Sequence, residues 1–298
     1  MTGVTSTLDT PLPDHRARSA LIHRGMRLLR KYPTACAGGV LLAVIIVLGL
    51  FAPWLGTVDP TAIAPGRRAL LPSAQHWFGT DSLGRDLYSR VLYGARISML
   101  VGSSVALLAA FFGTVLGMLS GSIRWLDPIF MRVMDGLMSI PAILLAIALM
   151  SLTQGSVGNV IVAIVIVEVP RVARLIRGLV LSIRERPFVE AAIVSGTPSY
   201  RIMLRHILPN TFAPLIVQAT HIFAAAIVIE AILSFIGAGA PPTTPSWGNI
   251  MAEGRALWQI KPHIVFIPAA FLSLTVLSIN VLGDGLRDAL DPHSMRSF

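Results

Sequence analysis

Apolar residues occur in six long runs, and charged residues gather mainly in the links between them. Each run has about 20 residues, which as a helix spans the roughly 30 Å hydrocarbon core of a bilayer. The pattern therefore predicts an all-α polytopic membrane protein with six transmembrane helices. The expected spans cover residues 34–54, 97–120, 128–152, 157–180, 212–236 and 263–282.

Composition agrees with a membrane location. Of the 298 residues, 54% are hydrophobic and only 13% are charged, whereas a soluble domain carries about a quarter charged residues. The mean hydropathy is +0.72. The formal net charge of +9 is compatible with a nucleic-acid-binding protein. However, the basic residues flank apolar runs and do not alternate with aromatic residues along one surface. We therefore expect contact with membrane lipid and none with nucleic acid.

The distribution of arginine predicts the orientation. Residues 171–206 contain seven arginines against Glu185 and Glu190, whereas the link at residues 154–158 has no charge. Cytoplasmic links carry the excess of Lys and Arg. We expect residues 184–210 to be cytoplasmic, together with an N-terminal tail (1–33) and a C-terminal tail (293–298). Residues 34–292 then form one membrane domain, whose first span is an uncleaved anchor.

The link at residues 55–96 is an exception to this charge rule, because the six-span topology places it on the external side. Asp81 is expected there to cap a helix on whose surface Asp86 and Arg90 pair, four residues apart. Other acids also accompany the arginines of this link. Its arginines are Arg67, Arg68, Arg85, Arg90 and Arg96.

The cytoplasmic segment 184–210 predicts a helix, a tight turn and a second helix. Pro187 suits the start of a helix over 188–195, Gly196 suits a left-handed stop, and Thr197 followed by Pro198 suits the start of the next helix. A helix of about two turns is not stable alone in water. It either docks against another protein surface or lies as an amphipathic connector at the lipid headgroups.

One string in this segment resembles a known motif. Glu190, Ala191 and Ala192, then Gly196 after three residues, and a distant Leu-Pro at 208–209 are similar to the EAA loop of the inner-membrane permease subunits of bacterial ABC importers. The resemblance implies that Glu190, Ala191 and Ala192 belong to a coupling helix seated in a groove of an ATPase subunit. It also implies that Gly196 makes the turn after this helix.

Three other strings narrow the resemblance. Residues 78–98, 230–251 and 282–292 resemble the second, C-type permease of dipeptide, oligopeptide and nickel importers. This implies a type I ABC importer permease fold and a translocation path for dipeptides or oligopeptides. Nickel or another small solute such as glutathione is the alternative cargo. The implied partners are a homologous second permease, one or two ATPase subunits that bind ATP and Mg²⁺, and an extracytoplasmic substrate-binding protein.

Chemistry on this chain itself is not expected. The sequence has no Gly-Lys-Ser/Thr phosphate loop and no HExxH or GxSxG string, so we expect no catalytic residue, no resident metal and no cofactor. Glu230 lies within an expected span, where a carboxylate either lines the path or pairs inside the protein. Arg132 and Asp135, three apart, are expected to pair with each other. Pro141 is expected to bend the third span. Trp247 is expected to anchor at the membrane interface.

Overall fold

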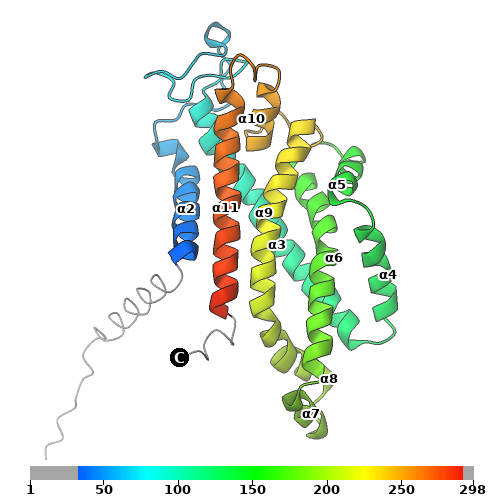
Figure 1. Ribbon diagram of the computed structural model, residues 1–298. Helices are drawn as coiled ribbons and strands as arrows, with labels where there is room; N and C mark the ends of the chain where they lie inside the picture. Colours follow the sequence, from blue (N-terminus) through cyan, green and yellow to red (C-terminus); the bar gives the residue numbers. More distant parts are fainter. Residues whose placement is uncertain (1–32, 291–298) are drawn as a thin grey trace, which may run out of the picture.

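The computed structural model describes residues 33–290, and this part of the chain consists of helices and loops without a named β-strand. The all-α prediction is confirmed for these residues, whereas the expected terminal tails lie outside them apart from Pro33. Of five long helices, four run roughly alongside one another, and the second in chain order slants across behind them (Figure 1). The five helices are α2 (Pro33–Leu50), α3 (Leu87–Ser122), α6 (Val157–Arg184), α9 (Leu208–Ile236) and α11 (His263–Leu290).

Shorter elements connect the long helices or lie at their ends. The short α-helices are α4 (Asp127–Met138), α5 (Ala142–Ser151), α7 (Pro187–Val194), α8 (Ser199–Ile202) and α10 (Trp247–Gly254). Two 3₁₀ turns, η1 (Ala52–Trp54) and η2 (Pro65–Arg67), lie before α3, and a π-helical turn, η3 (Met203–Ile207), leads into α9.

Four helical segments are long and apolar enough to cross a membrane: α2, α3, the segment from Ser199 to Ile236, and α11. A fifth span results if α4 and α5 count as one broken helix, bent by 91°. The bend follows from Pro141, whose backbone is extended and which has no N–H to donate; a bend at this proline is confirmed. α6 coincides with the remaining expected span but is charged at Glu168, Arg171 and Arg174, so the count of six stays a prediction.

α3 begins at Leu87, before the apolar run that starts at Ile97. Its N-cap is Asp86, whose carboxylate accepts the Ser89 N–H at 2.9 Å. The expectation that Asp81 caps this helix is therefore wrong. The expected surface pair of Asp86 and Arg90 is also wrong, because Arg90 is only 1% exposed and points to other acids.

Small residues let α3 and α6 approach closely. Three glycines on one stripe of α3 face α6, and an added Cβ would lie 2.4 Å from the Val172 Cβ at Gly113 and 2.6 Å from the Ala173 carbonyl oxygen at Gly117. Such small-residue stripes are the usual contact between helices in a membrane, where lipid and protein are equally apolar. The third glycine is Gly121.

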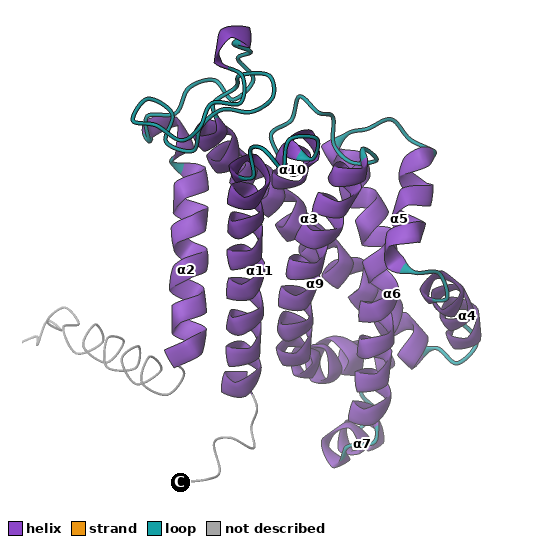
Figure 2. Cartoon of the chain, turned by 45° about the horizontal axis from the view of Figure 1, so that its top comes forward, coloured by secondary structure: helices purple, strands orange, loops and turns teal. Residues whose placement is uncertain are grey.

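The two ends of the helix bundle differ. The loop-rich residues 51–86, which we call the cap segment, lie with α10 at one end, and α7 lies at the opposite end (Figures 1 and 2). Trp247 at the start of α10 is 0% exposed, and its indole N–H donates to the Val91 carbonyl at 3.0 Å. The expected interfacial anchor is therefore a buried residue that fixes α10 on α3.

Candidate functional site

The short helix α7 follows α6 almost directly and ends in a left-handed glycine. Pro187 occupies its first position, and Gly196 has φ = +76°. The Thr197 N–H donates to the Ala192 carbonyl at 3.1 Å and the Gly196 N–H to the Ile193 carbonyl at 2.9 Å. These are the two bonds of a Schellman motif, which requires a left-handed residue at the Gly196 position. The predicted stop at Gly196 is confirmed.

α7 is held by one face and open on the other. Val189 is 0% exposed and belongs to the same buried cluster as Ile183 and Ile202, and Ala192 packs partly against this cluster. Glu190 and Ala191 are exposed, as is Gly196. The helix therefore presents most of the predicted coupling residues to the outside of this chain.

The exposed face of α7 is apolar as well as acidic. Val194 is 88% exposed and Ile193 55% exposed, and Tyr200 on the adjoining α8 is 62% exposed. A cluster of apolar side chains at a helix tip beyond the bundle marks a surface for a partner.

The return from α7 to the membrane helices is irregular. α8 begins at Ser199, with Pro198 in an extended conformation before it, so the expected N-cap at Thr197 is wrong. The π-turn η3 then precedes Pro209, which has no N–H for the ordinary helical pattern. The Phe188 and His206 rings lie 6.4 Å apart, which ties α7 to this return segment.

A cleft of about 700 Å³ opens at the α7 end between α6, α9 and α11. Its wall reaches Arg186, the N-cap residue of α7, and Asn210 at the start of α9, so movement of α7 and its flanks would reshape it. The polar side chains along the cleft are neutral or basic: Ser182, Arg186, Asn210, Gln218, His221 and Arg287.

Charged residues of α6 bind the broken helix beside it. Arg177 makes a two-pronged contact with Asp127, from Nε at 2.5 Å and Nη2 at 2.6 Å. Arg174 pairs with Asp135 across the two helices. The expected pair of Arg132 and Asp135 is therefore wrong, because α4 lies against α6 and the longer-range partner reaches the carboxylate. α6, which leads directly to α7, is thus also tied to α4.

Glu230 lies inside this chain and is 1% exposed. Ser234 donates to its Oε1 at 2.8 Å, and Ser98 and Ser246 lie near the same carboxylate, whose Oε2 has no hydrogen-bond partner within residues 33–290. These serines come from α3, α9 and the start of α10. Glu230 is therefore buried within this chain, and its role, pairing inside the protein or lining of the path, stays a prediction.

A buried ionic cluster, which sequence reasoning missed, joins the cap segment to the helices. Asp81 accepts from Arg85 Nε at 2.7 Å and from Arg90 Nη1 at 2.5 Å, and Glu253 of α10 also pairs with both arginines. Asp81 is 0% exposed. Glu253 lies more than 160 residues from Arg90 in sequence, so no local spacing in the sequence indicated this pair. The cluster explains how two of the arginines in residues 55–96 are neutralised.

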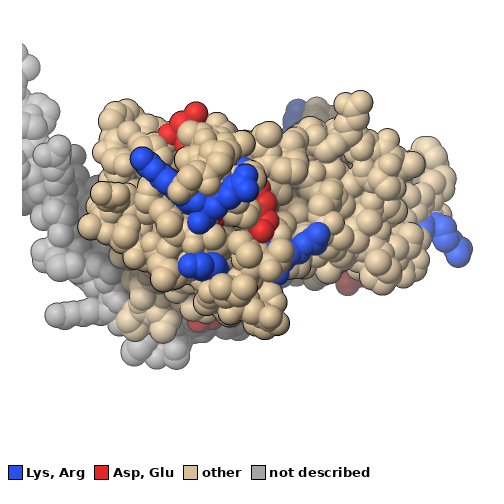
Figure 3. All heavy atoms as spheres, turned by 90° about the horizontal axis from the view of Figure 1, so that it is seen from above, with Lys and Arg blue, Asp and Glu red and all other residues tan. Residues whose placement is uncertain are grey.

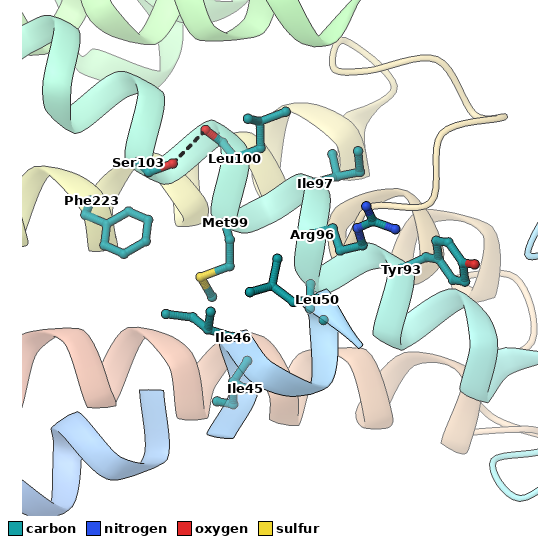
Figure 4. A pocket seen from close by; sticks show the side chains of 12 residues that line it. Ile45, Ile46, Leu50, Tyr93, Arg96, Ile97, Met99, Leu100, Ser103 and Phe223 are labelled. Atoms are coloured by element: carbon teal, nitrogen blue, oxygen red, sulfur yellow. Dashed lines mark hydrogen bonds between the residues drawn. The ribbon is translucent and has the colours of Figure 1, made fainter. Parts of the chain in front are cut away.

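An apolar cavity of about 710 Å³ lies between α2 and α3 near the cap segment. Figure 4 shows Ile45, Ile46 and Met99 along its wall, with Arg96 and Tyr93 at one side. The Arg96 guanidinium lies 5.7 Å from the centre of the Tyr93 ring. Among residues 33–290, no three His, Cys, Asp or Glu side chains are grouped to hold a metal ion.

The chain has relatives among known proteins. Residues 113–296 match the family described as binding-protein-dependent transport system inner membrane component. The chain belongs to this family. Residues 21–72 of this permease also match the N-terminal TM domain of oligopeptide transport permease C. The predicted resemblance to the C-type permease of peptide ABC importers is confirmed.

Several curated relatives support the same assignment. The permease is 51% identical to a probable peptide ABC transporter permease protein of Sinorhizobium fredii, over 92% of this chain and 94% of the relative. It is 43% identical to a dipeptide transport system permease protein of Alkalihalophilus pseudofirmus, over 89% and 87%. It is 42% identical to a glutathione transport system permease protein of Escherichia coli, over 91% and 90%.

The fold also matches a solved structure. The inward-facing MetNI methionine ABC transporter has a chain that aligns with a TM-score of 0.57 at 19% identity, covering 68% of this permease and 96% of that chain. At this identity the likeness shows the fold alone. The predicted type I importer permease fold is confirmed.

Proposed function

We propose that this permease forms, with a homologous second permease, the path for short peptides through the bacterial inner membrane. Separate ATPase subunits bind ATP and Mg²⁺ and act on α7, and an extracytoplasmic binding protein delivers the cargo. This chain carries no catalytic step. The observation that carries the proposal is α7: a two-turn helix anchored by Val189, open on its other face, and followed by a left-handed Gly196.

The position of α7 suits a lever. It follows α6 after two residues, and its other end returns through α8 and η3 to α9. A push on α7 therefore reaches two long helices, α6 and α9, that both line the cleft at this end. An ATPase groove that closes around α7 would change the separation of these two helices. Such a change is required for alternating access, in which the path opens first to one side of the membrane and then to the other.

The coupling role predicts three graded variants. Val194→Asp places a charge on the exposed apolar face, and Gly196→Val strains a left-handed position and re-aims the helix. Both should nearly abolish recovery of the ATPase subunits with the purified permease, and uptake with it. Glu190→Ala should be milder, because it removes one charge-assisted contact worth about 1.5–3 kcal/mol. The measurement is the ATPase-to-permease ratio of the purified complex alongside peptide uptake.

A matched control lies at the other end of the bundle. Val58→Asp changes an exposed valine of the cap segment and should leave the ATPase ratio unchanged. The partner permease should be recovered normally in all four variants. Wild-type ATPase ratios in both Val194→Asp and Gly196→Val would contradict the coupling role. They would favour the alternative that α7 is a connector at the lipid headgroups.

Orientation gives a separate test. With Cys36 replaced by serine, a cysteine at Ser156 or Thr244 should react with an impermeant thiol reagent in whole cells, because both residues lie at the cap end of the bundle. A cysteine at Ser199, beside α7, should react only after the membrane is opened. The reverse pattern of labelling would contradict the proposed topology with α7 and both termini in the cytoplasm.

Glutathione is a second candidate cargo, because the glutathione permease of Escherichia coli is about as similar as the dipeptide permease. Uptake of radiolabelled dialanine, trialanine and glutathione into cells with and without the permease distinguishes the two. Loss of peptide uptake alone supports the main proposal.

A further inference from the structure

The cap segment keeps two arginines that the ionic cluster does not neutralise. Arg85 and Arg90 are buried and paired with Asp81 and Glu253. Arg67 and Arg68 are exposed, and within residues 33–290 neither has an acidic side chain at salt-bridge distance. Arginines without an acidic partner are unusual on the external side of a membrane protein, because Lys and Arg are normally in excess on the cytoplasmic side. A specific role is therefore expected for this pair.

The backbone that carries the pair is fixed to the core. The Thr80 hydroxyl, which is fully buried, donates to the Arg67 carbonyl and accepts the Leu70 N–H at 2.9 Å. The Ala69 N–H donates to the Asp81 carbonyl at 2.9 Å. The Asp81 side chain is in turn held by Arg85 and by Arg90 of α3. The backbone of the arginine pair is therefore fixed relative to the helices.

Ala69 supports this view with a strained backbone. Its φ is +50°, which makes it the one residue other than glycine with positive φ in the part of the chain that the structure describes. A non-glycine residue in this region costs free energy and persists only where surrounding contacts enforce it. The strain directly follows Arg68, so the turn that presents the pair is enforced rather than relaxed.

The pair stands at the outermost point of this end. The turn η2, which contains Arg67, lies farther from the spanning helices than the rest of the cap segment (Figures 1 and 2). Seen from above, basic side chains stand on this face (Figure 3). Leu71 and Trp77 of the same segment are 59% and 62% exposed. Arginine and aromatic side chains together are typical of the centre of a protein interface.

We propose that Arg67 and Arg68 form the contact point for an acidic face of the soluble substrate-binding protein. This inference rests on the proposed function and adds the surface and the chemistry of recognition. Lipid phosphates suit arginine as well, but the outermost position favours a soluble partner. A fixed backbone lowers the entropy lost when the arginine side chains are ordered, and opposite charge raises the rate of encounter.

The test uses the complete importer, with its ATPase subunits, in liposomes of phosphatidylcholine. The measured quantity is the concentration of peptide-loaded binding protein that gives half-maximal stimulation of ATP hydrolysis. The double variant Arg67→Glu/Arg68→Glu should raise this concentration about tenfold or more at low salt, because like charges then face each other. The difference should shrink toward 1 M salt, where the screening length is about 3 Å. ATP hydrolysis without binding protein should be unchanged.

Arg124→Glu is the matched control, since Arg124 is an exposed arginine in the link between α3 and α4, near the α7 end. It should leave the half-maximal concentration unchanged. An unchanged value in the double variant would overturn the proposal. So would a difference that exists only in liposomes containing anionic lipid, which would assign the pair to headgroups. Failure of the wild-type complex to hydrolyse ATP in response to any binding protein would instead count against the proposed function.

Discussion

Arg90→Met is expected to cause a large loss of stability, because Arg90 of α3 belongs to the ionic cluster that joins the cap segment to α10. Arg90 donates to Asp81 and to both carboxylate oxygens of Glu253, and its side chain is 1% exposed. Removing one member of a buried ion pair costs about 3–5 kcal/mol, because the remaining charge stays buried without compensation. The variant should show a much lower yield of purified complex and a lower thermal unfolding midpoint.

Arg96→Met provides the control on the same helix. Arg96 is exposed and contacts the Tyr93 ring but no acid of residues 33–290, so its loss should lower the midpoint only slightly. The double variant Arg90→Met/Glu253→Gln leaves Asp81 with Arg85 and no surplus negative charge. It should be more stable than Arg90→Met alone, as coupled charges in one network require. Equal midpoints for Arg90→Met and Arg96→Met would show that the cluster does not hold the cap segment on the bundle.

The sequence was most informative where structure depends on local pattern. Apolar runs predicted the helical class, Pro141 predicted a bend, and Gly196 predicted a left-handed stop, because each of these follows from a few adjacent residues. The string at Glu190, Ala191 and Ala192 added a role through resemblance, and the structure places this string at the tip of the bundle.

The sequence was least informative where a contact joins distant segments. Arg90 has an acid four residues before it, so local spacing favoured Asp86, yet the fold brings Glu253 of α10 to the same guanidinium. Asp135 likewise pairs with Arg174 and not with Arg132. The proline-rich link around Trp247 predicted a residue at the membrane interface, but the packing of α10 on α3 buries Trp247. Each of these outcomes depends on helix packing, which periodicity alone does not fix.

The double variant Gly113→Ala/Gly117→Ala should separate α3 from α6 and reduce both stability and transport. The added Cβ atoms would lie 2.4 Å from the Val172 Cβ and 2.6 Å from the Ala173 carbonyl oxygen, far inside normal contact distance. Overpacking of this kind costs about 1–3 kcal/mol per site, although alanine favours a helix over glycine by about 0.5–1 kcal/mol. The unfolding midpoint of the purified complex should therefore fall, with the steric term larger than the propensity gain.

Gly178→Ala separates the steric effect from the gain in helix propensity, because a Cβ at Gly178 of α6 has no neighbouring atom within 4 Å. Only the helix propensity then changes, and the variant should be as stable as the wild type or slightly more stable. α6 leads directly into α7, so a shift of α6 away from α3 also moves the coupling helix. Gly113→Ala/Gly117→Ala should accordingly lower uptake more than it lowers the amount of assembled complex, whereas Gly178→Ala should change neither. Full uptake per assembled complex in the double variant would show that the register of α6 on α3 does not control the position of α7.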